Sequence, residues 1–134
     1  MADNLFKIEI ITPDRVFYSD ECDFLEFTTS EGEIGVYRNH IALTTVLAPG
    51  QVTIHKEGEE KIAALHAGFA EILGDRVTLL AEIAEWPHEI DVPRAEAAKE
   101  RAEGRLSGNH GDIDVARAEL ALRKALLRIN IAGR

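Results

Sequence analysis

The sequence predicts an all-β domain, a sandwich or a barrel, at residues 1–86, followed by an antiparallel two-helix hairpin at residues 87–134. In the first segment, short apolar and β-branched runs are separated by turn signals, which is typical of sandwiches and barrels. In the second segment Ala, Glu, Lys and Arg dominate, and these residues favour helix. The chain has 134 residues, of which 46% are hydrophobic, so it can bury a core without disulfides.

The first expected strand contains Phe6, Ile8 and Ile10, which alternate with charged residues at the period of a half-buried strand. Further strands are expected at residues 16–18, 24–29, 52–55, 61–66, 69–73 and 76–81. Residues 31–36 hold two glycines without the spacing of a phosphate-binding loop, so we interpret them as a tight turn. Gly74-Asp75 predicts a type II′ hairpin, because Gly tolerates the positive φ of the first turn position.

Two helices are expected after the strands. Asp91 can cap a first helix at residues 92–106, and residues 107–111 then break it. Asp112 can cap a second helix at residues 113–131. Helices joined by a short polar loop predict an antiparallel hairpin.

The apolar faces of these helices are unequal. The first helix has a shallow stripe of alanines, at Ala95, Ala98 and Ala102. The second helix has two stripes, one of Ile113, Ala116, Leu120, Leu127 and Ile131 and one of Val115, Ala118, Leu122, Ala125 and Ile129. One stripe can meet the first helix, and the other needs the β domain or another protein. Because alanine buries little area, the hairpin should be marginally stable, which predicts a detachable arm. Plain structural packing is the alternative.

The charge is distributed unevenly. The net charge of −9 argues against a nucleic-acid partner. Residues 1–86 carry −10 and residues 87–134 carry +1, with basic residues gathered towards the C-terminus. This asymmetry either aids solubility or prepares a basic helix to dock on an acidic protein surface.

Other features of the sequence indicate the expected cellular location of the chain. No apolar run approaches the roughly 20 residues that span a bilayer, and residues 1–10 lack the pattern of a secretory signal. The single cysteine, Cys22, excludes an internal disulfide. A cytosol-facing location is expected, with any membrane contact made through another protein.

No constellation for catalysis or metal binding is evident. The histidines have no metal-ligand spacing, and Cys22 has no CxxC partner. Asp91 at the N-terminus of a helix is ordinarily only a cap. Arg94 and Arg101, two helical turns apart, could converge with basic residues of the second helix around a phosphate, since guanidinium groups match phosphate oxygens.

Seven stretches together resemble the epsilon subunit family of the bacterial rotary F-type ATP synthase. They are residues 30–36, His40, 48–50, 67–71, 77–81, Ile90-Asp91-x-x-Arg94-Ala95 and 116–121. The resemblance covers essentially the whole chain. It implies an all-β sandwich of about ten strands followed by the two-helix hairpin, and a non-catalytic subunit with no required cofactor and no metal.

The resemblance also implies partners. The sandwich would contact the gamma subunit and the membrane rotor ring of c subunits, on the cytoplasmic side of the cell membrane and without insertion. The expected rotor-interface residues are Glu31, Gly32, Glu33, Val36 and His40. The hairpin would extend among the alpha and beta subunits and inhibit ATP hydrolysis.

In some members of this family the compact hairpin binds ATP as a regulatory ligand. The residues that match that site are Glu85, Ile90, Asp91, Arg94, Ala95, Arg101, Lys124 and Arg128. Lys124 stands where well-known ATP binders of the family carry arginine. Lysine keeps the positive charge but cannot form the two parallel hydrogen bonds of a guanidinium group.

Three functions therefore compete: a rotor-stalk subunit with a regulatory arm, a free-standing β-sandwich binding module with a helical tail, and an enzyme. A pull-down with the gamma subunit separates the first two. Hydrolysis by the isolated chain would support the third.

Overall fold

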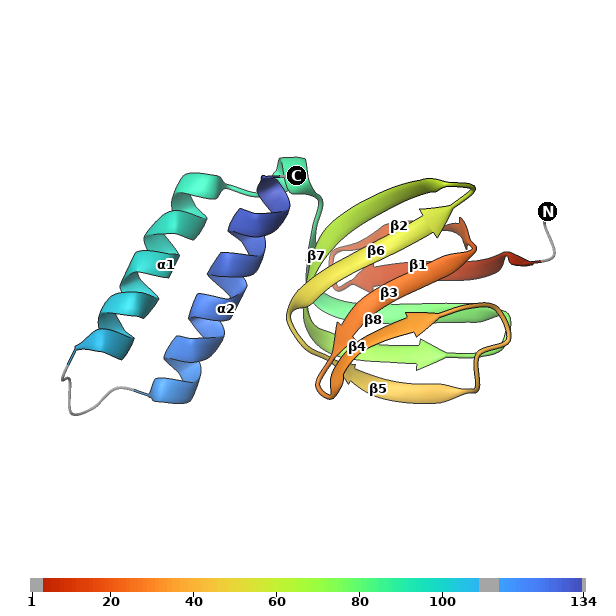
Figure 1. Ribbon diagram of the computed structural model, residues 1–134, viewed down its shortest axis with the longest axis horizontal. Coiled ribbons are helices and arrows are strands. Elements are labelled where there is room, and N and C mark those ends of the chain that lie inside the picture. Colours follow the sequence, from red (N-terminus) through yellow and green to blue (C-terminus); the bar gives the residue numbers. More distant parts are fainter. Residues whose placement is uncertain (1–3, 109–113, 134) are drawn as a thin grey trace. The chain divides into compact units, whose positions relative to one another are not determined.

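The computed structural model describes residues 4–108 and 114–133 of the chain. These residues form two units, Met1–Glu85 and Trp86–Arg134. The first unit consists of strands and the second of helices (Figure 1). The all-β sandwich followed by two helices is confirmed.

Eight strands build the β unit, fewer than the ten or so that were expected. They are β1 (Phe6–Thr12), β2 (Arg15–Cys22), β3 (Phe24–Thr29), β4 (Gly32–Val36), β5 (Leu43–Leu47), β6 (Gly50–Lys56), β7 (Glu59–Ile72) and β8 (Arg76–Glu85). They pair in the order β2-β1-β8-β7-β5-β3-β4, and β6 pairs with β3 and β7 outside this path. The sheet folds over on itself into two layers (Figure 1).

The long strand β7 joins the two layers. The expected run 61–66 lies in it, and so does the expected run 69–73 up to Ile72; a bend at Ala67 (φ 48°) and Gly68 (φ 138°) separates them. Before the bend β7 pairs with β6, and after it β7 pairs with β5. A Cβ at Gly68 would collide with the backbone oxygen of Leu80, so glycine is required there. One bent strand thus replaces two.

Alternation along the strands forms the core. Phe6, Ile8 and Ile10 of β1 are buried, and Lys7 between them is exposed. The largest fully buried side chains include Leu25, Phe27, Ile54, Ile72 and Leu79. Cys22 is also buried, and burial raises the pKa of its thiol to about 12, so it is held as an unreactive thiol.

Two turn predictions are wrong. Residues 32–36 are not a turn but strand β4, which pairs antiparallel with β3 after a turn at residues 30–31. Gly74 lacks the positive φ that a type II′ turn needs. The reversal instead closes with the Leu73 amide donating to the Arg76 carbonyl at 2.8 Å.

The helical unit contains the short helix η2 (Pro87–Glu89), α1 (Val92–Ser107) and α2 (Val115–Ala132). Asp91 caps α1 as expected, because its Oδ1 accepts a hydrogen bond from the Arg94 amide at 3.1 Å. The cap of α2 is Asp114, whose Oδ1 accepts from the Arg117 amide at 3.1 Å. The expected cap Asp112 lies outside the described residues. The two helices lie antiparallel (Figure 1).

Alanine forms the seam between the helices, as expected. The buried residues of α1 are Ala95 and Ala102, and those of α2 are Ala118, Ala125 and Ile131. On both helices the buried alanines are seven residues apart, the spacing of a helix-pair seam. Within residues 4–108 and 114–133, no helix is long and apolar enough to cross a bilayer.

Candidate functional site

An apolar stripe crosses the outer face of the β unit. Cross-strand pairing joins, in order, Val46 of β5, Phe69 of β7, Leu80 of β8, Ile11 of β1 and Val16 of β2. Directly paired residues point to the same face of a sheet. Val46, Phe69, Leu80 and Val16 are 47%, 58%, 49% and 61% exposed, and Ile11 is half-buried. We call these five residues the apolar stripe.

The stripe has the anatomy of an interface. A shallow cavity of about 350 Å³ lies over it, lined in part by Ile11, Phe69 and Leu80. The next row across the same strands is polar, formed by Thr44, Glu71, Thr78, Glu9 and Ser19. Single exposed apolar residues are ordinary, but a contiguous patch with a polar rim marks a binding surface.

The expected rotor-interface residues do not all lie on the surface. Glu31, Gly32 and Glu33 are exposed at the β3–β4 turn and the start of β4. His40 is half-buried in the β4–β5 connection, with its Nδ1 at 2.6 Å from the Ile41 carbonyl oxygen. Val36 is buried, so its side chain belongs to the core and offers no contact surface.

The connection between β4 and β5 carries two large exposed side chains that the sequence patterns did not single out. They are Tyr37 and Ile41. The Tyr37 ring stacks on Phe24 with the ring centroids 4.3 Å apart, which restrains it despite its exposure.

The residues of the expected nucleotide site occupy different surroundings. Asp91 is exposed and engaged as the α1 cap, and the Arg94 amide is its partner. Ile90 and Ala95 are buried. Arg101 is exposed on α1, while Lys124 and Arg128 are half-buried on α2. Glu85 ends β8 in the other unit, where its Oε1 lies 3.0 Å from Nε2 of the buried His66.

Four basic residues share one flank of the hairpin. Arg94 and Arg101 each precede a buried alanine of α1, and Arg117 and Lys124 each precede a buried alanine of α2. In an antiparallel helix pair, the positions just before the seam residues lie on the same side of the pair. Among the described residues none of these four side chains makes an ion pair within 4.0 Å. We call these four residues the basic flank. Its unpaired cations repel one another and suit an anion.

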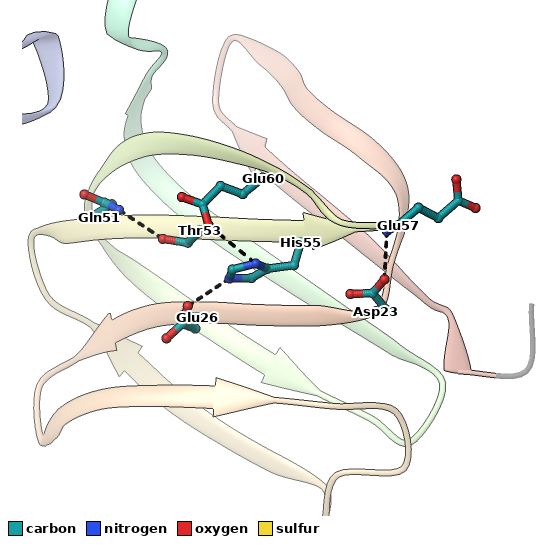
Figure 2. A network of polar contacts seen from close by, with 7 residues as sticks. All are labelled: Asp23, Glu26, Gln51, Thr53, His55, Glu57 and Glu60. Carbon is teal, nitrogen blue, oxygen red and sulfur yellow. Dashed lines mark hydrogen bonds and ion pairs between the residues drawn. The ribbon is translucent and has the colours of Figure 1, made fainter. Parts of the chain in front are cut away.

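A second group of polar side chains lies on the β unit (Figure 2). His55 of β6 has its Nε2 2.9 Å from Glu26 of β3 and its Nδ1 3.6 Å from Glu60 of β7. Nearby, the Glu57 amide donates to Asp23 at 2.9 Å. The two contacts of His55 connect the neighbouring strands β3, β6 and β7. In the part of the chain that the structure describes, no three His, Cys, Asp or Glu side chains gather into a metal-binding group.

Family models match almost the whole chain. The model described as ATP synthase, Delta/Epsilon chain, beta-sandwich domain matches residues 5–87. The model described as ATP synthase, Delta/Epsilon chain, long alpha-helix domain matches residues 88–133.

Individual proteins match over the same length. The ATP synthase epsilon chain of Caldanaerobacter subterraneus subsp. tengcongensis is 44% identical over 133 residues, which are 98% of this chain and 96% of that one. The ATP synthase epsilon chain of Halalkalibacterium halodurans is 44% identical over 128 residues, 95% of this chain and 96% of that one.

The fold has a solved counterpart in a Euglena gracilis mitochondrial ATP synthase structure, solved as OSCP/F1/c-ring. One chain of that structure aligns with a TM-score of 0.82 at 22% identity, covering 96% of this chain and 81% of that one. At this identity the likeness concerns the fold alone. The family models and the epsilon chains of similar length lead to one conclusion: this chain belongs to the family of ATP synthase epsilon chains.

Proposed function

We propose that this chain is a non-catalytic central-stalk subunit of an F-type ATP synthase that docks on the gamma subunit through the apolar stripe. The observation that carries the proposal is the contiguous exposure of Val46, Phe69, Leu80 and Val16 across the strands. Solved structures with similar folds bear titles that name the c-ring and the central stalk. The names of the similar epsilon chains agree with this assignment.

The energetics of the stripe fit an anchor for a partner. Burying a large aliphatic or aromatic side chain contributes about 1.5–3 kcal/mol. Four such side chains, each about half exposed, therefore offer several kcal/mol to a partner with a matching surface. A central apolar cluster with a polar rim is also the usual arrangement of binding hot spots.

The rotor ring of c subunits would meet the opposite kind of surface, the polar turn that begins β4. Glu31, Gly32 and Glu33 are exposed there, and His40 lies in the next connection. Val36 supports this turn from the core and makes no contact itself. This assignment rests on the family resemblance of these residues.

The helical unit would act as a regulatory arm. Its alanine seam buries little apolar area, so the helices can separate at low cost. The helices α1 and α2 hold 16 and 18 residues, so end to end they would reach about 50 Å at 1.5 Å a residue. An arm of that length could enter the space among the alpha and beta subunits and inhibit ATP hydrolysis.

ATP would stabilise the compact hairpin. Its phosphates would bind the basic flank and Arg128, next to the capped N-terminus of α1 formed by Ile90, Asp91 and Ala95. A ligand at a hundred times its dissociation constant stabilises the state that binds it by about 2.7 kcal/mol. That is enough to hold a marginal hairpin closed. ATP is here a regulatory ligand and not a substrate.

A pull-down with the purified gamma subunit tests the docking surface. Phe69→Glu should weaken gamma binding more than about tenfold, because it removes an anchor and buries a charge. Tyr37→Glu is the matched control, since Tyr37 is similarly exposed but lies outside the stripe. Unchanged binding by Phe69→Glu would refute the docking surface. No binding by the unmodified chain would favour a free-standing module.

A further inference from the structure

Three carboxylates border the apolar stripe of the β unit. On each of the three central strands a glutamate stands two residues from a stripe residue: Glu71 from Phe69 on β7, Glu82 from Leu80 on β8 and Glu9 from Ile11 on β1. Residues two apart on a strand point to the same face of the sheet. Glu9 and Glu71 therefore lie on one side of the stripe and Glu82 lies on the other. We call these three residues the acidic border.

The acidic border is not neutralised by the rest of the β unit. Among residues 4–108 and 114–133, none of its carboxylates makes an ion pair within 4.0 Å. Lys7 and Arg76 stand opposite each other one row farther from the stripe. On the side of Glu82, Arg15 directs its guanidinium group at the Ala84 carbonyl oxygen, 3.4 Å away. The negative charge beside the stripe is therefore available to a partner.

Docking on the stripe would also take these carboxylates out of water. The cavity of about 350 Å³ over the stripe is lined by Phe69 and Leu80 together with Glu82, so a side chain that enters it comes close to a carboxylate. A carboxylate that loses water without gaining a cation or a hydrogen-bond donor destabilises a complex. A purely apolar partner surface would match the stripe and leave the acidic border unpaired. A surface that also carries cations would satisfy both.

We propose that the acidic border selects the partner of the stripe, which is a surface with an apolar projection for the cavity and lysine or arginine side chains on both sides of it. The inference rests on the proposed docking of the gamma subunit, and it adds the charge that the contact surface of gamma must carry. Opposite charges across an interface speed association, and like charges exclude wrong partners. The stripe thus supplies affinity, and the acidic border supplies specificity.

Association kinetics of the full chain with the purified gamma subunit, measured over a series of salt concentrations, test the proposal. The double variant Glu71→Gln with Glu82→Gln removes one charge on each side of the stripe. It should associate about three- to tenfold more slowly than the unmodified chain at low salt. At about 1 M salt, where the Debye length is about 3 Å, the two chains should associate at similar rates.

A second double variant is the matched control. Glu57→Gln with Glu59→Gln changes the net charge by the same amount, but both residues are exposed at the turn between β6 and β7, away from the stripe. Its association rate should stay close to that of the unmodified chain. Glu82→Lys should slow association more than Glu82→Gln does, because it sets a cation against the cations of the partner.

The outcomes distinguish this inference from the proposed function. If gamma binds the unmodified chain and the Glu71→Gln, Glu82→Gln variant equally fast at low salt, selection by charge is refuted and gamma docking stands. Faster association of that variant would also refute it, since the contact surface of gamma would then be acidic. Equal slowing in the control variant would refute it as well, because only the net charge would then matter. If the unmodified chain does not bind gamma, both the proposed docking and the inference fail.

Discussion

At the scale of single residues, a charged cluster on Asp20 connects two strands that do not pair with each other. Asp20 of β2 accepts hydrogen bonds from the Glu21 amide at 2.8 Å and from Lys56 Nζ of β6 at 3.1 Å. The Tyr18 hydroxyl donates to the same carboxylate at 3.5 Å. The amide bond first, and then Lys56, lower the pKa of Asp20 from its ordinary value of 3.8.

The sign of this shift predicts how Asp20→Asn behaves. Because the folded pKa lies below the unfolded one, Asp20 stabilises the fold above pH 3.8 and loses that effect as the pH falls through the folded pKa. The pair is partly exposed, so Asp20→Asn should lower the free energy of unfolding at neutral pH by less than about 1 kcal/mol. Denaturant titrations across the acid range measure this difference. If the difference in free energy of unfolding between Asp20→Asn and the unmodified chain stayed constant down to the lowest pH, the lowered pKa of Asp20 would be contradicted.

At the scale of elements, the bend in β7 decides how the two layers are joined. Gly68→Ala should destabilise the β unit by more than about 1 kcal/mol, because the new Cβ meets the Leu80 carbonyl at a positive φ. Gly58→Ala is the matched control, since Gly58 also has a positive φ, 82°, but open space around it. Denaturant unfolding of both variants separates the clash from the backbone strain. If Gly68→Ala and Gly58→Ala lowered the free energy of unfolding equally, the bend would be shown to tolerate a side chain.

The alanine seam is the element that would allow the proposed arm to detach. Ala102→Leu places a large side chain in the seam and should weaken the hairpin by about 1–3 kcal/mol. Ala97→Leu, on the exposed side of the same helix, controls for helix propensity. Far-ultraviolet circular dichroism should show earlier thermal loss of helix for Ala102→Leu alone. Identical melting of both variants would mean that the seam is not tightly packed.

At the scale of the whole molecule, local patterns predicted most of the fold. The alternation around Ile8, the cap at Asp91 and the alanines at Ala95 and Ala102 each depend on near neighbours in the chain. Near neighbours also decide strand and helix formation, so the order of the two segments could be predicted. The family resemblance, which depends on order and spacing of many stretches, is confirmed by the family models.

Features that depend on distant residues could not be predicted. Phe69 and Leu80 are large apolar residues of the kind that usually lie in a core. Only the cross-strand register reveals that they line an outer face. His66 meets a carboxylate 19 residues away, for which no local pattern exists. The type of turn at Gly74 was predicted wrongly: glycine permits a positive φ at this position, but Gly74 does not adopt one.

Some candidate residues were placed by resemblance, and the structure refines them. Alternation along β4 puts Val36 in the core, which separates it from the exposed Glu31 and Glu33. Arg117 joins Arg94, Arg101 and Lys124 on the basic flank, although the family motif did not include it. The sequence signal for Arg117 was its position just before Ala118, an alanine of the seam.

ATP hydrolysis by a reconstituted F-type complex tests the central claim, a rotor-stalk subunit that inhibits by releasing its helices. Ala102→Cys and Ala118→Cys place one thiol on each helix of the seam, and Cys22→Ala removes the native thiol. With these cysteines crosslinked, the chain should bind the complex and leave hydrolysis uninhibited. Reduction of the same sample should restore inhibition, which controls for the substitutions. Full inhibition by the crosslinked chain would contradict the account.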